Sequence, residues 1–105
     1  MQRDFGGVIW TNHAIERMKD RKIKQGDAWS TWKRPDVSEY NKVKGVWVYK
    51  RTYPGEKIEV VAKKNEKGEW IILSVWNKYL NTSGSMHSKK SLIQFLRSYF
   101  KPSRA

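Results

Sequence analysis

Three side chains that could act on a phosphodiester recur at intervals of four residues near the N-terminus. His13, Arg17 and Arg21 would share one face of a helix, because residues four apart are neighbours on a helix surface. An imidazole can take up or release a proton near neutral pH, and guanidinium groups bind phosphate oxygens in pairs. We therefore take these residues as candidate catalytic residues. The alternative is a capping histidine beside a solvated basic face.

The place of His13 in its helix favours this chemistry. In the first turn, free backbone N–H groups and the positive end of the helix dipole attract anions and disfavour a protonated imidazole. A phosphate could therefore dock beside a largely neutral His13, which would act as a general base or acid. RNA cleavage needs the 2′-hydroxyl deprotonated, the charged phosphorane stabilised and the leaving 5′-oxygen protonated, and these steps require no metal.

No metal or other cofactor is expected. The sequence shows no cluster of carboxylates at the spacing of a two-metal nuclease. Cysteine is absent, which removes thiolate metal sites, disulfides and a thiol nucleophile.

A second group of candidate residues lies on predicted strands, where side chains alternate between the two faces. Over residues 46–53 this alternation places Trp47, Tyr49 and Arg51 on one face. Rings beside cations form a platform on which unpaired bases stack, so these three residues are predicted to bind nucleic acid. The same alternation over residues 69–77 places Ser74 on this face, where its hydroxyl would contact a phosphate as a fourth catalytic group.

The opposite, aliphatic face of these strands is expected to pack on the helices. It would carry residues such as Val48, Leu73 and Val75. The alternative is that a C-terminal helix covers the ring face, in which case Trp70 and Trp76 are core residues.

The charge of the chain points to a polyanion. It has 22 Lys and Arg against 10 Asp and Glu, for a net charge of +12, and residues 41–105 carry +10 of it. Such an excess repels itself in a compact chain and is explained by a nucleic-acid partner. The basic tail is predicted to contribute Lys89, Lys90 and Arg97 to this contact, and RNA is the expected partner.

The expected cellular location of the protein follows from features that the sequence lacks. It has no long apolar run, so no membrane partner is expected, and its N-terminus does not resemble a signal peptide. Without cysteine, a reducing, cytoplasmic location is the expectation.

The elements that must position these residues form one α+β domain over residues 1–105. A short N-terminal strand and two helices are predicted to pack on an antiparallel meander of three to four strands, followed by a polar loop and a basic C-terminal helix. Thr11 or Asn12 is the expected cap of the first helix, and Pro35 ends the second. The predicted ranges are a strand at 8–10, helices at 12–21 and 25–33, strands at 46–53, 57–63 and 69–77, and a helix at 88–100.

The run from Trp10 to Arg21 contains the string His-Ala-x-x-Arg-Met-x-x-Arg, and Ser74 lies between apolar residues of the last strand. Over residues 8–77 these features resemble a domain family of unknown function, which is similar in turn to small metal-independent ribonuclease toxins of the barnase, EndoU, colicin and RelE type. The resemblance implies the fold of those toxins, with catalytic roles for His13, Arg17, Arg21 and Ser74. Residues 78–105 lie outside it.

Three functions remain open at this point. The first is a metal-independent endoribonuclease, toxin-like, that an acidic antitoxin or immunity protein would inhibit. The second is a non-catalytic basic module of a phage or plasmid that binds nucleic acid. The third is a module that binds an acidic protein.

Overall fold

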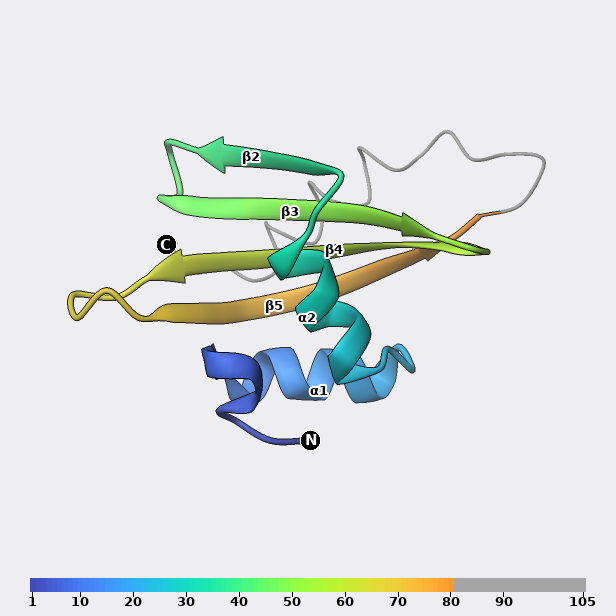
Figure 1. Ribbon diagram of the computed structural model, residues 1–105, viewed down its shortest axis with the longest axis horizontal. Helices are drawn as coiled ribbons and strands as arrows, with labels where there is room; N and C mark the ends of the chain where they lie inside the picture. Colours follow the sequence, from blue (N-terminus) through green and yellow to red (C-terminus); the bar gives the residue numbers. More distant parts are fainter. Residues whose placement is uncertain (81–105) are drawn as a thin grey trace, which may run out of the picture.

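The computed structural model describes residues 1–80, and the predicted helix at 88–100 therefore lies outside the described residues. Over these residues the fold is α+β, as predicted, with two helices and a mixed sheet of five strands (Figure 1). Both helices and the strands of the meander lie where local patterns predict them, and one strand is additional. In chain order the elements are a 3-10 turn (Phe5–Gly7), β1 (Ile9–Trp10), α1 (Asn12–Asp20), α2 (Gln25–Lys33), β2 (Val37–Asn41), β3 (Val46–Tyr53), β4 (Glu56–Lys64) and β5 (Trp70–Tyr79).

Thr11 both begins α1 and ties it to the sheet. Its Oγ1 accepts a hydrogen bond from the Ala14 backbone N–H at 3.0 Å, which satisfies an otherwise unpaired donor of the first turn. The same hydroxyl donates to the Leu73 carbonyl at 3.0 Å, and the Thr11 N–H donates to the Ile72 carbonyl at 3.2 Å. The start of α1 is thereby fixed against β5, and the buried Ala14 and Met18 hold the helix there.

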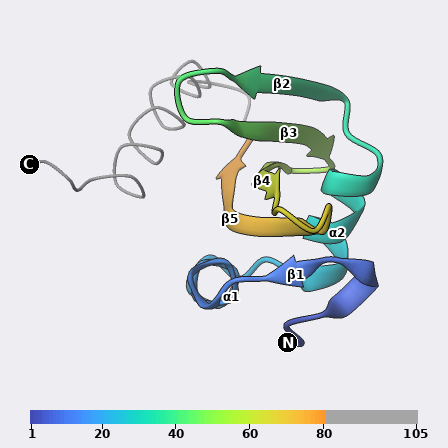
Figure 2. The same cartoon turned by 90° about the vertical axis from the view of Figure 1, so that its left-hand side faces the viewer.

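The strands are arranged in the order β1-β5-β4-β3-β2. β3, β4 and β5 form the predicted antiparallel meander, while β1 pairs in parallel with the start of β5 through Ile9↔Ile71 and Trp10↔Ile72. Because β1 is only two residues long, most of the β5 edge is left to α1, which runs alongside it (Figure 1). α2 stands against one face of the sheet (Figure 2).

Sequence patterns missed β2. Its residues, Val37–Asn41, are exposed or half-buried and include one aliphatic side chain, so they lack the alternation that marks a half-buried strand. The strand exists because its backbone pairs with β3, for example through Tyr40↔Trp47, and because Asp36 accepts a 2.9 Å hydrogen bond from the Thr52 N–H. The sheet therefore has one strand beyond β3 that the predicted meander lacked.

A β-bulge in β5 corrects the predicted assignment of side chains to faces. Val61 pairs with Ser74 while the next residue, Ala62, pairs with Ile72, so Leu73 is an extra residue in β5. One extra residue inverts the alternation from that point onward. Ser74 therefore does not share a face with Trp47 or Tyr49, and the prediction that it does is wrong.

The prediction that the aliphatic face packs on the helices is wrong for β3 and for the start of β5, and it holds for Val75 because the bulge brings that residue to the helix side. The helices pack on the face that carries Tyr49, Val60 and Ala62, together with Val75 beyond the bulge. A separate buried cluster on the opposite face contains three of the residues expected against the helices, together with Val61 of β4: Val46, Val48 and Leu73.

Candidate functional site

The first candidate site is the row of side chains along α1. Arg17 donates from Nε to His13 Nε2 at 3.5 Å, so the two groups lie one helical turn apart on the same side, as the spacing predicts. Arg21 follows a further turn along, and a hollow of about 450 Å³ opens beside it. The residues that line this hollow are Arg17, Asp20, Arg21, Lys22, Asn77 and Tyr79.

The surroundings of His13 favour its neutral form. Partial burial lowers the pKa of His13 below its ordinary value, and the positive charge of Arg17 lowers it further, against a smaller opposing effect of Glu16. The hydrogen bond from Arg17 also requires Nε2 to be an acceptor, which is the unprotonated nitrogen of a neutral ring. At neutral pH His13 is therefore in the state that a general base needs.

Arg21 is held at the far end of the row by two residues of β5. Its guanidinium carbon lies 3.3 Å from the centroid of the Trp76 ring, and Nη1 donates to Asn77 Oδ1 at 3.5 Å. Asn77 is itself buried and donates to Glu56 Oε1 at 3.0 Å and to the Arg21 carbonyl at 3.4 Å. A planar cation fixed in this way is prepared to bind an anion without first losing side-chain freedom.

Ser74 belongs to the side of the sheet on which Arg21 stacks. The bulge places it on the face of β5 that carries Trp76, two residues further along. Its side chain is fully buried, and Oγ has no hydrogen-bond partner among residues 1–80. The hydroxyl would reach a phosphate only after neighbouring side chains moved, so its catalytic role stays a prediction.

The residues predicted to bind nucleic acid are partly brought together. The rings of Trp47 and Tyr49 lie 6.0 Å apart and nearly parallel, at 12°. Arg51 is directed elsewhere: its Nη1 donates to the Arg34 carbonyl at 3.3 Å, and its guanidinium lies over Tyr53. Lys89, Lys90 and Arg97 lie outside the described residues.

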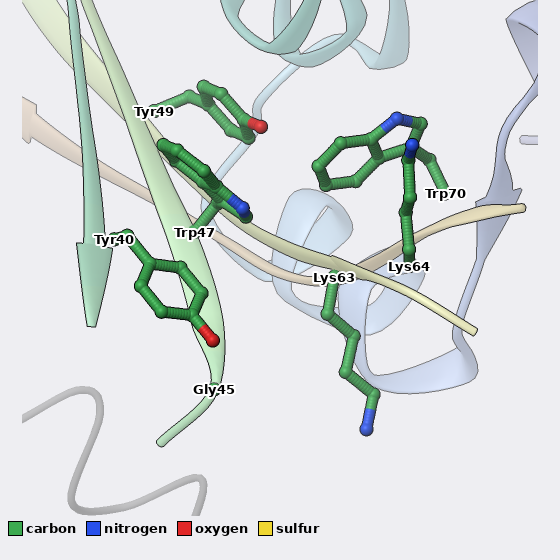
Figure 3. Close-up of a pocket in the computed structure, with 7 residues that line it drawn as sticks. All are labelled: Tyr40, Gly45, Trp47, Tyr49, Lys63, Lys64 and Trp70. Carbon is green, nitrogen blue, oxygen red and sulfur yellow. The ribbon is translucent and has the colours of Figure 1, made fainter. Parts of the chain in front are cut away.

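Sequence reasoning missed part of the ring cluster. The ring centroid of Tyr40, on the unpredicted β2, lies 5.2 Å from that of Trp47, and Lys63 and Lys64 lie at the end of β4. Only the pairing of β2 with β3 brings Tyr40 to this place. These residues surround a second hollow of about 410 Å³ (Figure 3), lined by Tyr40, Gly45, Trp47, Tyr49, Lys63, Lys64 and Trp70.

Two further features bear on function. Within residues 1–80, no group of three or more His, Cys, Asp and Glu side chains is placed to hold a metal ion. Among the same residues, no helix has the length and apolar character needed to cross a membrane.

Comparison with known proteins assigns the chain to a family. No curated protein and no solved structure is detectably similar to it. Residues 10–77, which run from the end of β1 into β5 and include both hollows in large part, match a domain of unknown function, DUF4258. The match covers more than half of the sequence, and the chain therefore belongs to the DUF4258 family.

Proposed function

We propose that this protein is a metal-independent endoribonuclease, toxin-like, whose active site is the row formed by His13 and Arg17 on α1 and by Arg21 at the C-cap of that helix. The observation that carries the proposal is the neutral imidazole of His13 next to the guanidinium of Arg17, one turn from a second guanidinium already fixed in place. A base beside two phosphate-binding cations meets the needs of RNA transphosphorylation.

In the proposed reaction, the scissile phosphate binds between Arg17 and Arg21. Because phosphate competes for the Arg17 guanidinium, the hydrogen bond from Arg17 to His13 Nε2 breaks and the lone pair of Nε2 is freed. Nε2 then takes the proton of the 2′-hydroxyl, the 2′-oxygen attacks phosphorus and the bond to the 5′-oxygen breaks. The leaving oxygen takes a proton from water, and the products are a 2′,3′-cyclic phosphate and a 5′-hydroxyl.

The charges and the fold support this proposal. The net charge of +12 attracts RNA and concentrates it at the surface. Two helices on an antiparallel meander, with the His-Ala-x-x-Arg-Met-x-x-Arg string on the first helix, also suit the RelE-like and barnase-like toxins named above. A toxin of this kind would act in a cytoplasm, and an acidic antitoxin or immunity protein would match its charge.

The test is cleavage of labelled RNA with and without EDTA, by the wild type, His13→Ala and Lys19→Ala. Lys19 is exposed on the same helix and serves as the matched control. We expect EDTA-resistant cleavage to a cyclic phosphate by the wild type and Lys19→Ala, and loss of cleavage in His13→Ala with its melting temperature and RNA affinity retained.

Salt-sensitive binding of RNA by all three proteins without any cleavage would refute the enzyme. It would favour the non-catalytic binding module instead. Equal cleavage by His13→Ala and the wild type would show that the active site lies elsewhere.

A further inference from the structure

The hollow on the other side of the sheet has the form of a binding site for a flat ring. Trp47 of β3 and Trp70 of β5 stand on either side of an open space (Figure 3). Between them, the same face of β4 carries Ala62, which pairs with Trp47 and is fully buried beneath the hollow's rings. Trp47 lies at 12° to Tyr49, and Tyr49 lies at 72° to Trp70, so the two indole planes are steeply inclined to each other. A planar group that stacks on Trp47 would therefore meet Trp70 edge-on.

The rings around the hollow support one another. Tyr40 packs against Trp47 at 5.2 Å, Trp47 lies nearly parallel to Tyr49, and Tyr49 meets Trp70 edge-on at 6.1 Å. Yet Tyr40 is 52% exposed and Trp47 36% exposed. Large rings that are held in position and still face solvent are prepared for stacking, because a ligand would bury their surface without ordering them first.

The charges select the class of ligand. Lys63 and Lys64 are exposed at the rim, and the Lys64 ammonium lies 5.6 Å from the centroid of the Trp70 ring. None of the described residues that line the hollow is acidic. A cationic ligand is disfavoured, because a lysine already occupies the position over the ring and repels a second positive charge. A ligand with a flat aromatic group and a nearby negative charge fits both features, and a nucleotide has both.

We propose that this hollow binds an unpaired base of a single-stranded nucleic acid by stacking on Trp47, with Trp70 edge-on beside it and a neighbouring phosphate on Lys64. The site deepens the proposed function, on which it rests for RNA as the physiological ligand. It is separate from the α1 row, because Arg21 stacks on Trp76, which the bulge places on the opposite face. A duplex cannot offer its bases to the rings, so single strands are the expected ligand.

The experiment measures binding in the His13→Ala background, so that cleavage does not interfere. Fluorescence anisotropy follows a short labelled RNA, a DNA of the same sequence and the matching RNA duplex. Trp47→Leu keeps an apolar side chain but removes the flat ring, and should weaken single-strand binding by roughly 5- to 150-fold. Trp47→Tyr restores a ring and should bind nearly as the parent does.

The lysine is tested by the salt dependence of the same binding. Lys64→Ala should weaken binding and reduce the slope of log affinity against log salt by about one phosphate contact. Lys24 is an exposed lysine at the start of α2, away from the hollow, and Lys24→Ala removes the same charge there. This control should reduce the affinity and the salt slope less than Lys64→Ala does. The DNA arm decides whether the ribose contributes to recognition.

Two results would overturn the site: binding by Trp47→Leu equal to that of the parent, or duplex binding as tight as single-strand binding. Neither depends on catalysis. If the wild type cleaves RNA and binding does not depend on Trp47, the base-binding site in the hollow is refuted and the ribonuclease is not. If binding depends on Trp47 and the wild type does not cleave RNA, the ribonuclease is refuted and the base-binding site is not.

Discussion

Two buried hydroxyl groups in this protein should respond in opposite ways to removal. Ser74 and Thr31 are both fully buried. Thr31 Oγ1 bonds to the Asp27 carbonyl and to the Tyr53 hydroxyl, each at 2.9 Å, whereas Ser74 Oγ has no hydrogen-bond partner in the described part of the chain. Burial of a hydroxyl without a partner costs about 1–3 kcal/mol in protein mutational data. Ser74→Ala removes that cost and loses only the packing of one oxygen atom.

We therefore expect Ser74→Ala to raise the free energy of unfolding by about 1 kcal/mol, at the low end of that range because one oxygen's packing is lost. In a domain of this size the melting temperature would rise by roughly 4–8 °C. Thr31→Val removes a hydroxyl that is bonded and leaves Tyr53 with one partner fewer, so it should lower the free energy of unfolding by about 1–2 kcal/mol.

Thermal and urea unfolding of the two variants beside the wild type provide the measurement. Destabilisation of Ser74→Ala to the extent seen in Thr31→Val would refute the reasoning, since it would mean that the Ser74 hydroxyl has a bonded partner in solution. The cleavage assay on the same protein tests the predicted catalytic role. Higher stability with slower cleavage would show that the hydroxyl is retained for function.

Four further predictions concern charged groups. Because Arg17 lowers the pKa of His13, Arg17→Gln should raise that pKa in an NMR titration of the imidazole, and a value unchanged or lower would contradict the assigned cause. For the wild type, cleavage by neutral His13 should increase with pH through a pKa below the ordinary 6.5 and then level off. Arg21→Lys loses the planar stack on Trp76 and should lower the free energy of unfolding by roughly 0.5–2 kcal/mol in urea denaturation, whereas an unchanged midpoint would show that the stack is not stabilising. Burial raises the pKa of Glu59 despite the opposing charge of Lys50, so ionisation of Glu59 favours the unfolded state as pH rises above its unfolded value. The melting temperature of Glu59→Gln should therefore exceed that of the wild type at pH 7 and equal it below about pH 4. A difference in melting temperature that widens on acidification would contradict the raised pKa of Glu59.

Local signals in the sequence determined most of the backbone. Thr11 caps α1 and Pro35 follows α2, while alternating side chains and turns mark β3, β4 and β5. The His13, Arg17 and Arg21 row follows from the helical repeat alone, since any helix over these residues places them on one side. These features depend on residues close together in the chain, which is why sequence reasoning reached them.

Pairing between distant strands decided the rest. β2 has too few apolar residues to be recognised and forms because β3 offers it a partner, and only that pairing brings Tyr40 to Trp47. The bulge at Leu73 arises from the register between β4 and β5, and no alternating pattern along β5 reveals it. One extra residue there moves Ser74 from the ring face to the face of Trp76 and Arg21, because each step along a strand reverses the side on which a side chain lies. The sequence alone thus determined the row on the first helix and the shared face of Trp47 and Tyr49. The strand register decided that Tyr40 joins those rings and that the row and the ring cluster lie apart.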